Sequence, residues 1–230
     1  MPQAEIWERE YQNPQLLTKG AVPRSDVKRF VKFLRKIEDV DLQNLTILDL
    51  GSGTGRNAIY LAEMGNRVVG LEISNTAIEI AKSRTKESGV DVKYQIADIG
   101  SKYPFDNESF DIVLDVMTSN SLNEKERAIY LSEVHRVLKQ GGYFFVRALC
   151  KDGDKNARNL LKKCPGREHD TYINEDMELT ERVFSRDDFV GAYSRFFKIL
   201  KLTKKTNYAK FNGQNYKRNY WLANMKKVNN

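Results

Sequence analysis

The sequence is poor in the residues that metal centres and disulfide frameworks need. Its 230 residues include two cysteines, Cys150 and Cys164, and two histidines, His135 and His169. Neither cysteine has a cysteine neighbour, so we expect free thiols in a reducing compartment. Two histidines that lie far apart do not make a histidine metal site. We therefore predict no bound metal.

Long hydrophobic runs are also missing. No stretch of about eighteen apolar residues is present, so no membrane span is expected. The N-terminal segment, MPQAEIWEREYQ, lacks the apolar region of a secretory signal. These absences predict a cytoplasmic protein. A chain of 230 residues is long enough for one domain with a full core, so we treat 1–230 as a single domain.

Acidic residues are absent from the last part of the chain. No aspartate or glutamate follows Asp188, and the formal net charge is +7. One interpretation is an anionic partner such as RNA. The other is that these lysines point outward along strands and protect a sheet edge from aggregation. The second is favoured, because no glycine-aromatic RNA-binding signature accompanies the charge.

What the sequence does contain is one well-organised stretch, residues 46–74. It reads TILDLGSGTGRNAIYLAEMGNRVVGLEIS. A short apolar run leads into a glycine-rich turn, a segment of helical period follows, and a second apolar run ends on Glu72. This order of strand, turn, helix, strand and acid is half of a nucleotide-binding α/β unit.

Each part of the stretch has a physical role. Glycines allow a positive φ and leave no Cβ between the backbone and a ligand. The following helix presents unpaired N–H groups and a positive dipole end toward the turn. Glu72, about twenty residues past the first glycine, can accept hydrogen bonds from both hydroxyls of a ribose.

The spacing of the turn is G-x-G-x-G, unlike the dinucleotide form G-x-G-x-x-G. Leu48 to Gly55 resembles the first motif of the class I S-adenosylmethionine (SAM)-dependent methyltransferases, and Glu72 resembles the acid that ends their second. Asp98 fits the acid that accepts the exocyclic amine of adenine in this family. The segment from Arg136 to Gly142 is similar to the family's lead into the fifth strand, although Gln140 replaces the commoner proline.

The resemblance implies SAM as cofactor and S-adenosylhomocysteine (SAH) as product. Asp49 is expected to hold the turn or the amino group of the cofactor. Asp115 would bind the amino-acid end of the cofactor or orient the substrate, unless it is a structural carboxylate that caps a loop. The implied cofactor site consists of Asp49, Gly51, Ser52, Gly53, Thr54, Gly55, Arg56, Asn57, Glu72, Ile73, Ala97, Asp98, Ile99 and Asp115.

The expected fold class is α/β, a three-layer sandwich. Its seven-stranded, mostly parallel Rossmann-like sheet would end in an antiparallel C-terminal hairpin. The chain divides into a helical cap (1–43), a cofactor-binding core (44–149), a substrate-side insertion (150–183) and a C-terminal helix with hairpin (184–230). Strands are expected at 46–50, 67–71, 90–96, 110–115, 143–148, 196–203 and 216–225, and helices at 4–11, 26–37, 56–64, 75–87, 124–138 and 186–193. The expected punctuation is three N-caps, a glycine pair that stops the helix at 124–138, and a turn between the last two strands: Ser25, Ser74 and Ser185, Gly141-Gly142, and Asn212-Gly213.

Residues for catalysis and substrate binding carry weaker signals. His169, which lies beside acids in the insertion, can titrate near neutral pH and is one candidate base. Asp115 is the other. Trp7, Tyr11, Asn120 and Arg147 are candidates for substrate contacts. Trp7 and Tyr11 could instead only attach the first helix to the domain, and Arg147 could form a salt bridge to the insertion.

Methyl transfer from a sulfonium is an in-line displacement, so the enzyme must place a nucleophile and exclude water. A base is needed only if the nucleophile must lose a proton. The leading hypothesis is a methyltransferase for a small molecule, acting on an O, N or S nucleophile. The alternatives are an RNA or protein methyltransferase that uses the basic C-terminal region, a non-catalytic SAM-binding protein, and a nicotinamide oxidoreductase. The sequence does not indicate an oligomeric state.

Overall fold

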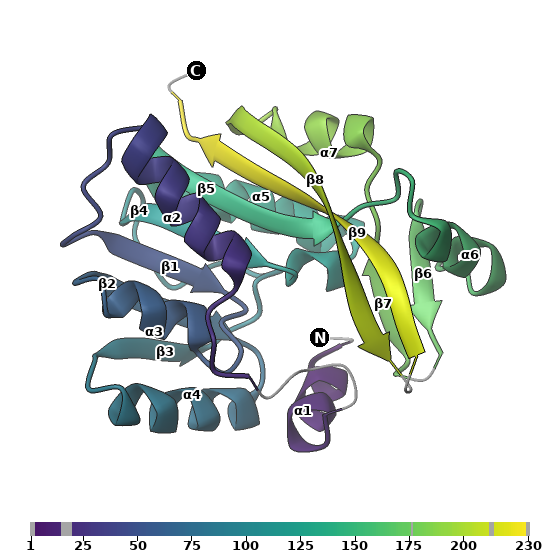
Figure 1. Cartoon of the computed structure of the whole chain (residues 1–230), viewed down its shortest axis with the longest axis horizontal. Helices are drawn as coiled ribbons and strands as arrows, with labels where there is room; N and C mark the ends of the chain where they lie inside the picture. Colours follow the sequence, from purple (N-terminus) through teal and green to yellow (C-terminus); the bar gives the residue numbers. More distant parts are fainter. Residues whose placement is uncertain (1–2, 15–19, 176, 212–213, 229–230) are drawn as a thin grey trace.

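A computed structural model describes residues 3–14, 20–175, 177–211 and 214–228. Its centre is a seven-stranded sheet in the order β3-β2-β1-β4-β5-β9-β8 (Figure 1). The first five strands of that order are parallel, whereas β9 runs antiparallel to both β5 and β8. The predicted α/β fold with a C-terminal hairpin is confirmed. The strands are β1 (Thr46–Leu50), β2 (Arg67–Glu72), β3 (Val92–Ile96), β4 (Phe110–Val116), β5 (Leu138–Leu149), β8 (Lys198–Phe211) and β9 (Gln214–Lys226).

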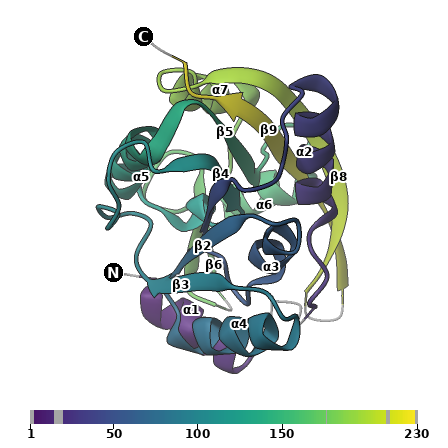
Figure 2. The same cartoon turned by 90° about the vertical axis from the view of Figure 1, so that its left-hand side faces the viewer.

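Helices cover both faces of the sheet, and Figure 2 shows α5 on one side of the strands with α2 and α3 on the other. Neighbouring strand residues point to opposite layers: Ile47 packs with α2 and α3, and Leu48 packs with α5 and α7. Apolar runs in β1 and β4 are therefore buried on both faces, as parallel strands require. The helices are α1 (Ala4–Gln12), α2 (Ser25–Ile37), α3 (Arg56–Ala62), α4 (Asn75–Glu87), α5 (Glu124–Val137), α6 (Lys155–Lys163) and α7 (Arg186–Tyr193), with the 3-10 turn η1 (Ser119–Ser121).

The insertion between β5 and α7 is itself ordered. It contains α6 and a two-stranded antiparallel sheet, β6 (Thr171–Asn174) and β7 (Leu179–Arg182). Its two ends lie side by side, because Cys150 and Phe184 form an isolated parallel β-bridge. The carboxylate of Asp154 accepts hydrogen bonds from the backbone N–H of Ala157 at 2.8 Å and of Asn219 at 2.6 Å. This buried aspartate therefore attaches the insertion to β9.

Three expected boundaries are wrong. Helix α5 ends at Val137 and β5 begins at Leu138, so Gly141 and Gly142 lie within the strand instead of stopping the helix. The cause is a tertiary contact, because Leu138 already pairs with Phe110 of β4, where the register of the two strands is irregular. Ser25 is the first residue of α2 and makes no side-chain cap.

Other terminal signals are confirmed. Ser74 and Ser185 accept the backbone N–H of Ala77 and Asp188 at the starts of α4 and α7, as N-caps do. The strands of the final hairpin are longer than expected, and its predicted turn at Asn212 and Gly213 lies outside the described residues. No helix in the described part of the chain is long and apolar enough to cross a membrane.

Candidate functional site

A cavity of about 990 Å³ opens at the carboxyl ends of β1, β2 and β4. Its floor is the glycine turn, and α1 and the insertion supply the opposite walls. Thirteen of the predicted site residues line it, which places most of the expected cofactor site in one space. They are Trp7, Tyr11, Gly51, Ser52, Gly53, Thr54, Arg56, Asn57, Glu72, Ile73, Ala97, Asp98 and Ile99.

The glycine turn needs glycine at two positions for different reasons. Gly51 has φ +62°, and a Cβ there would overlap the side chain of Thr118. Gly53 has φ +55°, and its Cβ would lie 2.7 Å from the hydroxyl oxygen of Tyr11. The backbone at this turn is therefore both left-handed and exposed to whatever enters between it and α1.

Glu72 ends β2 and holds the turn. Its carboxylate accepts hydrogen bonds from the backbone N–H of Gly53 at 2.9 Å, of Ile73 at 2.8 Å and of Ser74 at 3.0 Å. Burial raises the pKa of Glu72, and these backbone hydrogen bonds oppose the rise. Each carboxylate oxygen can accept more than one hydrogen bond, so the group can still bind ligand hydroxyls.

Asp98 follows β3 on the neighbouring side of the cavity. Its carboxylate accepts the backbone N–H of Gly100 at 2.8 Å, which fixes the loop, and it also lines the cavity. Asp98 and Glu72 thus present carboxylates to one space from the ends of two adjacent strands. This arrangement suits a ligand with several polar N–H and O–H groups.

Asp49 lies beneath the turn and does not line the cavity, and neither does Gly55. The Asp49 carboxyl is 1% exposed, and its Oδ2 has no hydrogen-bond partner. Burial raises the pKa of Asp49 to about 7, although the nearby Arg56 guanidinium acts in the opposite direction. Burial and the charge of Arg24 lower the pKa of Arg56 to about 10. An orphaned acid under a glycine cradle fits a ligand that carries positive charge, as SAM does.

Helix α1 borders the cavity and is attached just before its first residue and at its middle. The Gln3 side chain hydrogen-bonds to the backbone of Ser121 and Thr180, which connects α1 to η1 and β7. The Glu8 carboxylate accepts hydrogen bonds from the hydroxyls of Ser74 at 2.6 Å and Thr76 at 2.5 Å, at the start of α4. Both views show α1 beside α4 (Figures 1 and 2).

Asp115 and Asn120 do not reach the cavity. Asp115 is fully buried and accepts hydrogen bonds from the Tyr130 hydroxyl at 2.6 Å and the Thr118 N–H at 2.9 Å. Burial raises the pKa of this carboxyl. The Asn120 Oδ1 accepts the backbone N–H of Leu149 at 2.9 Å. Both side chains hold the loop after β4, which matches the structural alternative considered for Asp115.

Arg147 lies inside β5 and is also turned away from the cavity lining. Its guanidinium is buried, pairs with Asp26 of α2 at 3.2 Å and stacks on the Tyr220 ring at 3.8 Å. The expected partner was a substrate anion or the insertion, but the partner is the helical cap. Its neighbour Lys205 of β8 also pairs with Asp26.

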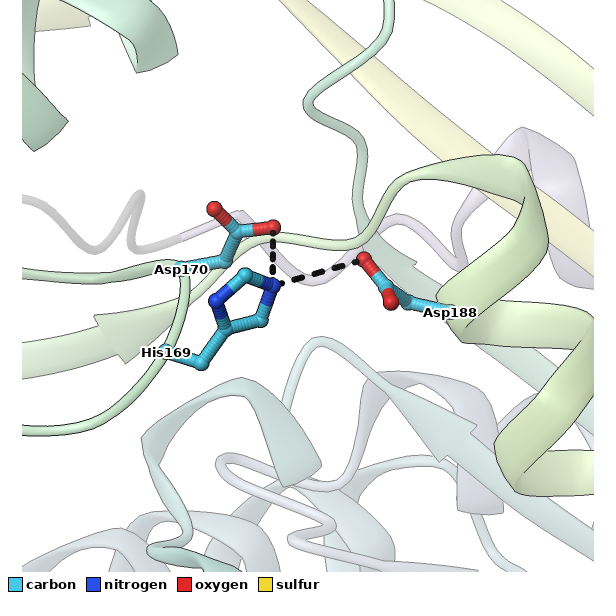
Figure 3. Close-up of side chains that lie close together, drawn as sticks. All are labelled: His169, Asp170 and Asp188. Atoms are coloured by element: carbon cyan, nitrogen blue, oxygen red, sulfur yellow. Dashed lines mark ion pairs between the residues drawn. The ribbon is translucent and has the colours of Figure 1, made fainter.

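His169 does not point into the cavity either. It is 66% exposed and lies 3.3 Å from Asp170 and 4.0 Å from Asp188, outside the residues that line the cavity (Figure 3). These three side chains could meet around a cation, but the Lys151 ammonium already occupies the Asp170 carboxylate. The cluster is best described as a surface charge network between the insertion and α7.

Sequence reasoning did not name five further residues that line the cavity. Arg24, Met117, Ser121, Arg167 and Thr180 line the cavity, and they come from the start of α2, the loop after β4 and the insertion. Met117 has φ +77°, a strained value at the edge of a functional cleft. Only its position after a buried parallel strand could have suggested it.

Part of the basic C-terminal region is engaged within the fold. Lys226 pairs with Glu38, Lys227 is buried and donates to the backbone oxygen of Leu138, and Arg218 pairs with Asp154. These contacts attach the hairpin to the rest of the domain. They leave less free charge than the sequence indicates.

Comparisons with known proteins agree with this geometry. Residues 47–142 match a protein family described as "Methyltransferase domain". Phthiotriol/phenolphthiotriol dimycocerosates methyltransferase of Mycobacterium tuberculosis is 35% identical over 112 residues, which is 48% of this chain and 40% of that protein. Ubiquinone biosynthesis O-methyltransferase of Pelagibacter ubique is 28% identical over 119 residues, 52% of this chain and 48% of that protein. The matched region spans less than half the length of both relatives.

A solved structure extends the likeness of fold to almost the whole chain. The 1,6-didemethyltoxoflavin-N1-methyltransferase of Burkholderia thailandensis, solved with its substrate and S-adenosylhomocysteine, superposes with a TM-score of 0.68. The superposition covers 98% of this chain and 87% of the Burkholderia chain, and the two sequences are 15% identical. The likeness of fold therefore extends beyond residues 47–142.

Proposed function

We propose that this chain carries a class I S-adenosylmethionine-dependent methyltransferase domain and methylates an O, N or S nucleophile of a small molecule, which the match of residues 47–142 to a methyltransferase family supports. The observation that carries the proposal is the cavity itself. One partly enclosed space joins the glycine turn, Glu72 and Asp98 to a second wall from α1 and the insertion. Donor and acceptor can therefore meet away from water, which a displacement on a sulfonium requires.

The chain's residues would divide the work as follows. Glu72 would accept hydrogen bonds from the ribose hydroxyls of the cofactor, and Asp98 from its adenine amine. The glycine backbone would leave room for the amino-acid end, and buried Asp49 would stabilise its positive charge from below. SAM, when bound, supplies a methyl group already activated on a sulfonium. The fold then contributes mainly position and exclusion of water.

The size and surroundings of the cavity support a small acceptor. Its volume of about 990 Å³ suits a cofactor together with a small partner. The two sequence relatives are named for a phthiotriol-type lipid and for ubiquinone biosynthesis, and the structural neighbour for a toxoflavin precursor. The RNA alternative has less support, because Lys226, Lys227 and Arg218 are engaged within the fold.

Two measurements test the proposal. Calorimetry should detect binding of SAH but not of NAD, which excludes the oxidoreductase alternative. Labelled SAM is then supplied with the small-molecule, RNA and protein fractions of a cell extract. Label should enter the small-molecule fraction. Label in RNA alone, or in protein alone, would contradict the proposed substrate class, and no label in any fraction would favour a SAM-binding protein without transfer activity.

A further inference from the structure

The titratable side chains that line the cavity indicate which kind of acceptor the site can use. This inference rests on the proposed function. Within the described part of the chain, no histidine, lysine or cysteine lines the cavity. The two histidines lie elsewhere: His169 is exposed, and His135 packs against Phe196 and Phe197. The titratable side chains that do line it are Tyr11, Glu72, Asp98, Glu126, Glu168, Arg24, Arg56, Arg84 and Arg167.

The four carboxylates of this wall already hold backbone N–H groups. In each case the acid fixes a turn or the start of a helix. Glu72 accepts from Gly53, Ile73 and Ser74, Asp98 from Gly100 at 2.8 Å, Glu126 from Asn123 at 2.9 Å, and Glu168 from Glu124 at 3.0 Å. Glu72 and Asp98 are assigned to the cofactor in the proposed function, and Glu126 and Glu168 fix the start of α5, so each acid already has another task.

Tyr11 cannot serve as the base either. Burial, together with the charge of Glu72, raises the pKa of the Tyr11 phenol well above its usual value. The phenol therefore stays protonated at neutral pH. It can donate a hydrogen bond into the cavity but cannot accept a proton from an acceptor.

Three of the four arginines in the cavity wall, by contrast, form no ion pair within the described part of the chain, although Arg56 lies near enough to Asp49 to oppose the rise that burial causes in the pKa of that carboxyl. Arg24, Arg56 and Arg167 form no ion pair with any of the described residues, although all three line the cavity. The Nε of Arg24 is buried without a hydrogen-bond partner. Unpaired guanidiniums beside a partly enclosed space favour the ionised form of an acidic ligand.

We propose that the acceptor enters with its nucleophilic atom already ionised, as a thiolate, a carboxylate or an acidic phenolate, and that no side chain of the enzyme deprotonates it. A lone pair of the ionised oxygen or sulfur forms the bond to the methyl carbon. The carbon–sulfur bond of the donor breaks, and its electron pair remains on sulfur. The two opposite charges cancel and no proton moves. Simple alcohols and alkylammonium groups, which must first lose a proton, are excluded as acceptors.

The first test uses 4-nitrophenol, whose visible absorption reports its ionisation, with the SAH complex. Its pKa should fall on binding by about one unit, because the phenolate should bind about tenfold more tightly than the phenol. 4-Nitrothiophenol and 4-nitrobenzoate extend the test to a thiol and a carboxylic acid. 4-Nitrobenzyl alcohol, which stays neutral, is the control of similar size. A raised pKa, or failure of all three acids to bind while SAH binds, overturns the proposal. If SAH itself does not bind, the proposed function fails instead.

A second test measures turnover of ring-substituted phenols and thiophenols of graded acidity. The pH at which kcat/KM reaches half its maximum should follow the acidity of each acceptor. One inflection at the same pH for all acceptors would reveal an enzyme base and overturn the proposal. Lys19 lies outside the described residues, so Lys19→Met is measured as well and should leave the profile unchanged. Turnover of alcohols or amines alone would refute this inference and leave methyl transfer standing.

A third test removes the positive charge. The double variant Arg24→Gln with Arg167→Gln should weaken binding of 4-nitrophenolate about tenfold or more, and the double replacement by lysine should restore part of it. Arg35→Gln, exposed near the far end of α2, is the matched control. SAH affinity is measured in parallel. Weaker SAH binding with unchanged phenolate binding would assign these guanidiniums to the donor and contradict their role toward the acceptor.

Discussion

The carboxylate of Glu72 accepts a hydrogen bond from the backbone N–H of Gly53 at 2.9 Å. The end of β2 therefore holds the glycine turn directly, and the residue expected to bind the ribose also shapes the cradle beneath the cofactor. A change at this position should affect ligand affinity and local structure together.

We expect Glu72→Ala to weaken SAH binding by about 1–3 kcal/mol, because it removes a charge-assisted hydrogen bond. It should also lower stability without ligand, since three backbone N–H groups lose their acceptor. Calorimetry and thermal unfolding measure the two effects. Glu72→Gln keeps one acceptor oxygen. Relative to wild type, this variant should therefore lose less thermal stability than SAH affinity. Unchanged SAH affinity in both variants would refute the ribose-binding role.

The attachment of α1 through Glu8 should depend on pH. Burial tends to raise the pKa of Glu8, but the hydrogen bonds from Ser74 and Thr76 outweigh it and the pKa lies below the usual 4.5. A lowered pKa means that the contact contributes stability above pH 4.5 and loses it as the pH falls through the folded-state value. Glu8→Ala should release SAH faster at neutral pH, as stopped-flow dissociation would show. Glu5→Ala, on the exposed side of the same helix, is the control and should not change the rate.

The raised pKa of Asp49 predicts a pH dependence of folding stability that is opposite in sign to that from Glu8. Its pKa of about 7 exceeds the usual 3.8, so the folded chain without ligand holds this proton more tightly than the unfolded chain. The corresponding stability is present below pH 3.8 and is lost as the pH rises through 7. A difference of about three in pKa corresponds to roughly 4 kcal/mol. Relative to Asp49→Asn, wild-type stability should therefore fall between pH 4 and 8, and denaturant unfolding at several pH values would detect it. A pH-independent difference between the two proteins would contradict the raised pKa.

Asp154 should matter for stability and for the order of the insertion. This carboxylate is 2% exposed and binds two backbone N–H groups and Arg218. Removing one partner of a buried ion pair costs about 3–5 kcal/mol. Asp154→Ala should therefore unfold at lower denaturant and expose the amides of β6 and β7 to hydrogen exchange. Asp91→Asn, at an exposed turn, serves as the control, and equal losses in both variants would show that Asp154 is not a specific anchor.

His169→Ala should leave methyl transfer within about twofold of wild type, because surface substitutions change free energies by only about 0.5 kcal/mol. The reason is its position, exposed and outside the cavity lining. A loss of a hundredfold or more in kcat, with SAH affinity unchanged, would restore the histidine as the base.

The sequence predicts the parts of this molecule whose causes are local. Apolar runs such as Ile47–Leu50 specify buried strands, Ser74 and Ser185 specify helix starts, and the glycine turn with Glu72 specifies the cofactor wall. Each of these signals lies within a few residues of the structure it determines.

Features decided by distant contacts were not predictable in the same way. Arg147 has the chemistry of an anion site, but its partner Asp26 lies 121 residues earlier in the chain. Asn120 is held by the backbone of Leu149, and α5 ends early because Leu138 pairs with β4. The part of the cavity wall that was not predicted is assembled from three separate segments, none of which carries a motif.

The parallel bridge between Cys150 and Phe184 has a practical consequence. The Phe184 N–H donates to the Leu149 oxygen at 3.0 Å, and the Lys151 N–H donates to the Phe184 oxygen at 2.8 Å. The chain thus leaves and re-enters the sheet at one place. Under the proposed function, the segment 151–183 is a unit through which acceptor preference could change between domains of this type while the cofactor-binding residues stay the same.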